Sequence, residues 1–125
     1  MNNEQNNLMS KILVVDDDTD ILLALKYILR SEGFEVETLS EAKEVDKKVD
    51  EMNPDIMLLD VNLAGYDGRL ICRHLKTEKG IDFPIILFSA DPSYQPTAEK
   101  FGADDFIFKP FEVPHLISQL NSHIS

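Results

Sequence analysis

The sequence predicts one α/β domain in which a parallel sheet is covered by helices on both faces. Short apolar runs without polar alternation, at 12–15, 56–59 and 85–88, are typical of strands buried on both sides. Helical patterns fill the intervals between these runs, and the connections are short. A length of 125 residues with 43% hydrophobic content suits about one domain with a real core. Residues 11–125 are therefore expected to form that domain.

The first half of the chain predicts two helices between three strands. The first helix begins after Asp18 or Thr19, either of which can cap it, and ends at Gly33. Its apolar positions recur at helical spacing: Ile21, Leu22, Leu25, Ile28 and Leu29. Residues 34–38 alternate apolar and acidic or polar residues, which predicts an edge strand. Ser40 is expected to cap a second helix that ends at 53–54 and whose core face is Ala42, Val45, Val49 and Met52.

The second half predicts two further strands and a less regular set of helices. A loop at 63–68 leads to a third helix closed by Gly80 and carrying Leu70, Ile71 and Leu75. In the segment 91–102, Pro92 and Pro96 leave little room for a regular helix. The last strand runs to Lys109. Pro114 lies in the first turn of the final helix, whose apolar face is Leu116, Ile117, Leu120 and Ile124.

Composition restricts the classes of partner. The formal net charge of −11 disfavours direct binding to nucleic acid or to an anionic membrane surface, and no apolar run approaches the ~20 residues that span a bilayer. The single cysteine, Cys72, is interpreted as a buried apolar residue, which suits the cytoplasm. Residues 1–10 lack the pattern of a secretion signal and are expected to be a disordered tail, with Met9 as an alternative start.

Acidic residues stand at the carboxyl ends of two predicted strands. Asp16 and Asp17 follow the first strand and Asp60 ends the third, so the parallel sheet should bring them together. Two carboxylates ~4 Å apart repel by about 4 kcal/mol at an effective dielectric constant of 20, so a cation is needed among three. Hard oxygen ligands favour Mg²⁺. The alternative is that 16–18 only cap the first helix, which needs just one acid.

Two further strand ends offer groups that bind phosphate. Lys109 would lie opposite the acids, where its ammonium could hold a phosphoryl oxygen and offset the carboxylate repulsion. Ser89 could donate a hydrogen bond to the same oxygen, or could simply cap a turn. The three histidines are isolated in sequence and do not form a metal-binding set.

At these residues the chain resembles the receiver domain of bacterial two-component response regulators, over nearly all of residues 11–124. The matching motifs are the acidic run 14–18, Leu58-Leu59-Asp60, Asp67-Gly68, Ser89-Ala90 and 108–111, in the family's order and on the matching strand ends. The resemblance implies a flavodoxin-like, doubly wound, five-stranded parallel sheet of order 2-1-3-4-5.

The resemblance also implies a reaction. Asp60 would take a phosphoryl group from a histidine kinase or a histidine phosphotransfer protein, with the help of Lys109 and Ser89. Mg²⁺, or Mn²⁺, would be held by Asp16, Asp17, Asp60 and the main-chain carbonyl of Asn62. The chain would catalyse only its own phosphorylation and dephosphorylation and would not otherwise be an enzyme. A carboxylate attacks phosphorus poorly unless positive charge balances the equatorial oxygens, which agrees with these roles.

The resemblance further implies a switch made by Ser89 and Phe106, and a stand-alone regulator without a DNA-binding output domain, a monomer or weak dimer with an unknown protein target. The loop 63–66 lacks the proline common in the family, and Phe106 has no hydroxyl where tyrosine is frequent. The fourth helix, at 91–101, is expected to be shortened or disordered and to give a non-standard output face. Asn62 and Asp91 are polar residues that could orient a water for dephosphorylation.

Two alternatives use the same fold. A phosphatase of the haloacid dehalogenase type also has an aspartate nucleophile and Mg²⁺, but here Thr19 stands one place too early for its motif, and a cap domain does not fit the length. A flavodoxin-like binder of a phosphorylated cofactor would need a Gly- or Ser/Thr-rich loop after the first strand, where three aspartates would repel the ligand.

Overall fold

The computed structural model describes residues 10–124. Five parallel strands form the central sheet: β1 (Lys11–Val15), β2 (Glu35–Leu39), β3 (Ile56–Asp60), β6 (Ile85–Ser89) and β7 (Asp105–Phe108). Their order is β2-β1-β3-β6-β7, and every pair is parallel. This confirms the predicted fold and strand order, since β4 and β5 form a separate small sheet. The predicted tail at 1–10 lies outside the described residues except for Ser10.

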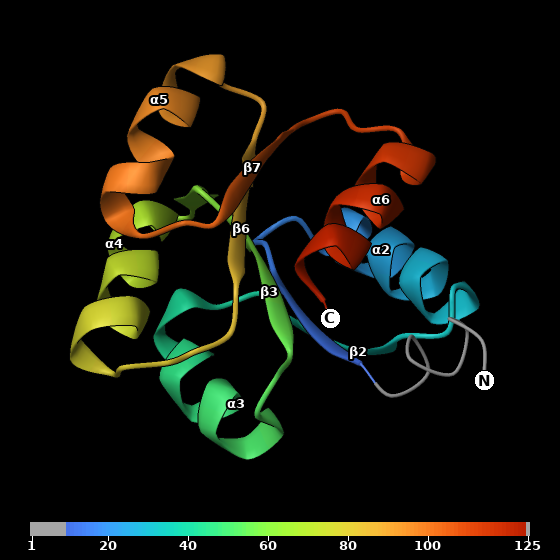
Figure 1. Ribbon diagram of the computed structural model, residues 1–125, viewed down its shortest axis with the longest axis horizontal. Coiled ribbons are helices and arrows are strands. Elements are labelled where there is room, and N and C mark those ends of the chain that lie inside the picture. The colour runs from blue at the N-terminus through green and yellow to red at the C-terminus, as the bar shows by residue number, and fades with distance from the viewer. Residues whose placement is uncertain (1–9, 125) are drawn as a thin grey trace.

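Helices cover both faces of the sheet (Figure 1). One face carries α2 (Thr19–Ser31) and α6 (Val113–His123). The other carries α3 (Val45–Met52), α4 (Gly68–Arg73) and α5 (Gln95–Ala98). No helix within residues 10–124 is long and apolar enough to cross a membrane.

The core is divided into two layers because successive strand residues point to opposite faces. In β1, Ile12 and Val14 pack toward α2 and α6, whereas Leu13 and Val15 pack toward α3 and α4. All residues of β3 and β6 are buried, as continuous apolar runs predict. Cys72 is also fully buried, and burial raises the pKa of its thiol to about 11, which confirms its interpretation as a packing residue.

Helix α2 follows the predicted pattern closely. The Asp18 carboxylate accepts hydrogen bonds from the backbone N–H groups of Asp20 and Ile21, at 3.0 and 3.3 Å. Gly33 follows the helix with a φ of 97°, a conformation that glycine adopts without strain. Of the two residues able to cap α2, Asp18 therefore does so.

The start of the second helix was predicted wrongly. Ser40 does not cap it; a 3₁₀ turn at Ala42–Glu44 comes first, with Glu41 at its N-cap position and no side-chain cap. Helix α3 then begins at Val45, also without a side-chain cap. The predicted core positions Val45, Val49 and Met52 are buried, so periodicity located the buried face although the capping signal was misleading.

The segment 62–80 also departs from expectation. The predicted loop is a small hairpin of β4 (Asn62–Leu63) and β5 (Tyr66–Asp67), with positive φ angles at Ala64 and Gly65 in the turn. The helix after it begins as α4 and continues as a π-helix over His74–Glu78. Leu70 is 54% exposed and is not a core residue, whereas Cys72 and Leu75 are buried.

The fourth helical segment is short and interrupted, as the two prolines predict. It consists of a 3₁₀ turn at Pro92–Tyr94, one α-helical turn in α5 and another 3₁₀ turn at Glu99–Phe101. Proline has no N–H to donate, so Pro96 cannot contribute a helical hydrogen bond at its own position. The segment is ordered, and of the two expected forms the shortened helix is the correct one.

Candidate functional site

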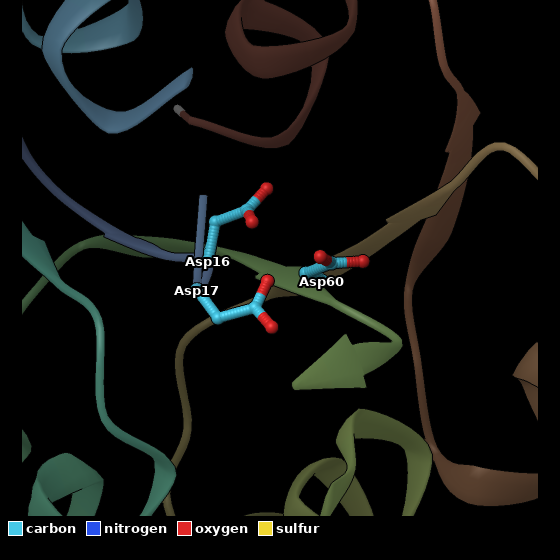
Figure 2. A group of neighbouring side chains, drawn as sticks. All are labelled: Asp16, Asp17 and Asp60. Atoms are coloured by element: carbon cyan, nitrogen blue, oxygen red, sulfur yellow. The ribbon is translucent and has the colours of Figure 1, made fainter. Parts of the chain in front are cut away.

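Three carboxylates meet at the carboxyl ends of the two central strands. Asp16 and Asp17 directly follow β1, and Asp60 is the last residue of β3 (Figure 2). Each side chain offers a carboxylate oxygen, and these oxygens lie within 4.8 Å of one another. Asp16 is fully buried and Asp60 is 4% exposed, while Asp17 faces solvent. The predicted convergence of the three acids is confirmed.

Lys109 lies opposite this cluster, just beyond the end of β7. Its Nζ donates to Asp16 Oδ2 at 2.8 Å and to Asp60 Oδ2 at 3.2 Å. The ammonium also lies 4.5 Å from the centre of the Phe88 ring, which favours a cation at that place. One positive charge thus bridges two buried negative charges, as the sequence predicted.

The electrostatic balance of the site is unfavourable to a charged Asp60. Burial, followed by the negative charge of Asp16, raises the pKa of Asp60 to about 6, although Lys109 and the backbone N–H of Asn62 oppose the shift. Burial lowers the pKa of Lys109, but its hydrogen bond to Asp16 and the charges of Asp60 and Asp16 outweigh burial, so the pKa is raised overall. A further positive charge beside that of Lys109 would therefore stabilise the ionised form of Asp60.

The three consecutive acids after β1, Asp16, Asp17 and Asp18, make different contacts. Asp18 is committed to capping α2, and its backbone N–H donates to Asp16 Oδ1 at 2.9 Å. Asp17 Oδ2 accepts a hydrogen bond from the backbone N–H of Ala64, 3.0 Å away in the β4–β5 turn. This contact joins positions 47 residues apart, and no feature of the sequence indicated it. Capping accounts for one acid, and the other two remain available to a cation.

The donor set fits Mg²⁺. Within residues 10–124, the group of Asp16, Asp17 and Asp60 is the one whose side chains are arranged to hold a metal ion. Carboxylate oxygens are hard ligands, and Mg²⁺ commonly binds through a few carboxylates while keeping water molecules. The raised pKa of Asp60 agrees with this fit, because burial and then the charge of Asp16 disfavour its ionised form in the protein alone.

The hairpin after β3 determines how the chain leaves Asp60. The backbone N–H of Asn62 donates to Asp60 Oδ1 at 3.2 Å, and that of Gly68 donates to the carbonyl of Val61 at 2.7 Å. A Cβ at position 68 would collide with the main-chain oxygen of Asp60. The Asp67-Gly68 pair therefore has a steric reason: only glycine allows α4 to begin so close to the end of β3.

The two residues predicted to form a switch are both buried. Ser89 ends β6 and is 1% exposed; its Oγ accepts a hydrogen bond from the backbone N–H of Asp91 at 3.1 Å, which is the turn-capping contact. Phe106 in β7 is 8% exposed, and its ring packs edge-to-face on Phe108 with centroids 5.2 Å apart. In this conformation the Phe106 side chain belongs to the core layer shared with α3 and α4.

A cluster around Arg69 was not predicted. Its guanidinium contacts both carboxylate oxygens of Asp67 and donates to Thr97 Oγ1 at 3.1 Å. It also lies 4.6 Å from the centre of the Tyr94 ring and 5.0 Å from that of Phe101. The side-chain hydrogen bond from Arg69 is the main reason that the pKa of Asp67 is lowered. Arg69 lies on α4, whereas Tyr94, Thr97 and Phe101 lie in the segment 92–101, which is distant in sequence, so periodicity could not reveal the cluster.

Comparisons of the sequence and of the structure with known proteins point to the same family. Residues 12–121 match the family model of the response regulator receiver domain. PhoP of Bacillus subtilis, an alkaline phosphatase synthesis transcriptional regulatory protein, is 40% identical over 103 residues, which are 81% of this chain and 42% of PhoP. The DNA-binding response regulator MtrA of Mycobacterium leprae is 32% identical over 117 residues, covering 94% of this chain and 52% of MtrA. The chain spans about half the length of the curated relatives it matches.

A solved structure shares the whole domain. The receiver domain of NtrX from Brucella abortus superposes with a TM-score of 0.83 at 31% identity, covering 90% of this chain and 97% of that one. The parallel sheet of order β2-β1-β3-β6-β7 and the acids at its carboxyl edge thus occur in a chain of which 90% matches that receiver domain. The chain belongs to the family of response regulator receiver domains.

Proposed function

We propose that this chain accepts a phosphoryl group on Asp60 from a histidine kinase or a histidine phosphotransfer protein. The observation that carries the proposal is the position of the Asp60 carboxylate, which is buried between two other acids and the Lys109 ammonium. A nucleophilic carboxylate needs positive charge nearby, because negative charge is spread over the phosphoryl oxygens during transfer. The chain's chemistry would be limited to its own phosphorylation and dephosphorylation.

Asp16, Asp17 and Asp60 would hold Mg²⁺, or Mn²⁺, together with the main-chain carbonyl of Asn62. The ion would supply charge stabilisation at the phosphoryl oxygens. Lys109 would hold another of these oxygens, and its two present partners, Asp16 and Asp60, keep its ammonium at the site. Ser89 would donate its hydroxyl to the phosphoryl group in exchange for its present contact with the Asp91 backbone.

The signal would be a shift between two conformations. Movement of Ser89 toward the phosphoryl group would change the space open to Phe106, which is buried in the present conformation and packs on Phe108. The shift is limited to the free energy by which the phosphorylated group prefers one conformation over the other. Because the net charge is −11, we propose that these residues deliver the signal to a protein surface and not to DNA.

The phosphatase alternative is less well supported. Its motif needs Asp18 to face the reacting group, two places after Asp16. Here the Asp18 carboxylate accepts hydrogen bonds from two backbone N–H groups of α2, so it is occupied as a helix cap. An aspartate used in this way is a poor general acid.

The test is phosphorylation by a small donor. The protein is incubated with acetyl phosphate and Mg²⁺ and its intact mass is measured, beside Asp60→Asn and the matched control Asp50→Asn, which changes an exposed carboxylate. We expect the wild type and Asp50→Asn to gain the mass of one PO₃ group and Asp60→Asn to gain none. An adduct on Asp60→Asn, or no adduct on the wild type under donor excess, would refute the proposal.

A further inference from the structure

The side chain of Tyr94 reaches into the neighbourhood of Asp60. Its hydroxyl donates to Asn62 Oδ1 at 3.4 Å, which is a long hydrogen bond. The backbone N–H of Asn62 in turn donates to Asp60 Oδ1. The segment 92–101 therefore contacts, through one hydroxyl, the residue two places after the phosphoacceptor. The role proposed for Asn62 in metal binding uses only its main-chain carbonyl, so its side-chain amide stays available to orient a water, and Tyr94 restrains that amide.

The position of the Tyr94 ring does not depend on this hydrogen bond alone. The guanidinium of Arg69 lies 4.6 Å from the ring centre. Arg69 is itself held by Asp67 and by Thr97 Oγ1, and Thr97 Oγ1 also donates to the backbone carbonyl of Tyr94 at 3.0 Å. The ring packs against the core layer on the α3 and α4 side. Several contacts thus place the hydroxyl at Asn62, and the loss of the hydroxyl alone should leave the ring where it is.

Solvent has access to the same place. A surface hollow of about 360 Å³ opens between the β4–β5 hairpin and the segment 92–101, with Asn62, Tyr66 and Tyr94 among its lining residues. Asn62 is exposed, so water can compete with Tyr94 for its Oδ1 atom. An amide oxygen has two lone pairs and can accept a hydrogen bond from an attacking water.

We propose that Tyr94, held by Arg69, is a positioning residue that restrains the Asn62 side chain and prolongs the lifetime of the acyl phosphate. This inference rests on the function proposed for Asp60. In hydrolysis a water oxygen bonds to phosphorus, and the bond from phosphorus to the Asp60 carboxylate oxygen breaks. Inorganic phosphate and one proton leave, and the carboxylate is regenerated. While the Tyr94 hydroxyl holds Asn62 Oδ1, the amide orients the attacking water less often, so hydrolysis is slower.

The test compares the decay of the phosphorylated protein in four versions: wild type, Tyr94→Phe, Asn62→Ala, and both changes together. Each is phosphorylated with acetyl phosphate and Mg²⁺, the donor is removed by rapid desalting, and the remaining adduct is followed by intact mass. Phenylalanine keeps the ring on Arg69 and removes only the hydroxyl. We expect Tyr94→Phe to shorten the half-life by about threefold, the effect of one weak hydrogen bond. In the Asn62→Ala background the same change should have no effect, because its partner is gone.

Tyr66→Phe is the matched control. Tyr66 lines the same hollow and is 53% exposed, and within residues 10–124 its hydroxyl makes no hydrogen bond. The half-life of phosphorylated Tyr66→Phe should equal that of the phosphorylated wild type. An unchanged or longer half-life in Tyr94→Phe, an equal shortening in both Asn62 backgrounds, or the same shortening in Tyr66→Phe would overturn the inference. If the wild type takes up no phosphate, it is the proposed function that fails; if it does and these half-lives are equal, only the role of Tyr94 fails.

Discussion

The two faces of the sheet are covered by helices of different regularity. On one face, α2 and α6 are continuous α-helices of 13 and 11 residues. On the other, α3 follows a 3₁₀ turn, α4 gives way to a π-helix, and α5 is one turn between two 3₁₀ turns. The central strands β3 and β6 are buried toward both faces, so there the difference lies in the helices and their connections and not in the sheet.

The irregular face also supplies contacts to the acid cluster and to Asn62, two places after Asp60. The β4–β5 turn donates to Asp17 through Ala64, and Tyr94 donates to Asn62. The regular face contributes the capping residue Asp18. Short, interrupted helices have fewer internal hydrogen bonds to lose when they move, so a change at Asp60 is more easily passed to this side. We therefore expect the regular face to act as the support if the irregular face shifts on phosphorylation.

The largest expected effect compares one fully buried leucine on each face. Leu29 lies in α2 and Leu75 in the π-helix, and both are 0% exposed. Leu29→Ala should lower the free energy of unfolding by about 3–4 kcal/mol, and Leu75→Ala by about 2–3 kcal/mol, because an interrupted helix can collapse further into the cavity. Urea denaturation of both variants measures the two values. Equal losses would show that the interruptions do not loosen the packing.

A smaller effect is expected at the boundary between the faces, at Asp60. Its folded pKa of about 6 exceeds the ordinary value of 3.8, so between these pH values the folded protein keeps a proton that the unfolded chain has released. The free energy of unfolding should therefore fall as pH rises through this window, by up to about 3 kcal/mol, and stay low above it. The Asp60→Asn variant has no carboxyl group at this position, so its free energy of unfolding should not show this fall.

Thermal unfolding in metal-free buffer at pH 4 and pH 7.5 tests this difference. Relative to the wild type, Asp60→Asn should gain stability between the two pH values. Adding Mg²⁺ at pH 7.5 should reduce the gain, since a cation stabilises the ionised wild-type cluster. A stability difference between the two proteins that stays constant from pH 4 to pH 7.5 would show that burial of Asp60 carries no such cost.

The smallest expected effect on stability concerns the contacts that His74 makes with two carboxylates on the irregular face. His74 Nε2 lies 2.8 Å from Asp46 Oδ2 on α3, and Nδ1 lies 2.9 Å from Glu78 Oε1. A neutral imidazole has one N–H and cannot donate to both carboxylates. The hydrogen bond to Glu78, then that to Asp46, raises the pKa of His74. The stabilisation is therefore present at low pH and is lost as pH rises through the folded pKa.

His74→Gln should cost about 0.5 kcal/mol at pH 6, since the pair is partly exposed, and less at pH 8.5. His115→Gln, which changes an exposed histidine on the regular face, is the matched control for the substitution itself. The free energies of unfolding from urea titrations at both pH values measure the effect. A larger cost at pH 8.5 than at pH 6 would contradict the predicted direction.

The same contrast explains how much could be predicted from the sequence. Strands were predictable because buried apolar runs have few other interpretations, and strand ends located Asp16, Asp60 and Lys109. Helix α2 was predictable because its periodicity and its cap agree. On the irregular face such signals conflict: Ser40 is a good capping residue that does not cap, and Leu70 fits the helical period but is exposed.

The contacts that hold the irregular face together were beyond prediction. Arg69 joins Asp67, Thr97 and Tyr94 through bonds that depend on the relative placement of two helical segments. The two-residue strands of the hairpin are too short to show alternation. A pattern along the chain records which residues are buried, whereas these contacts depend on angles between elements that only the folded chain specifies.

The buried thiol of Cys72 makes this chain convenient to label. Its burial and its raised pKa leave almost no reactive thiolate at neutral pH. A cysteine introduced at an exposed position, such as Tyr27→Cys on α2 or Lys100→Cys in the segment 92–101, would therefore react alone with a maleimide dye. Fluorophores at these two positions would report which side of the sheet moves when acetyl phosphate and Mg²⁺ are added.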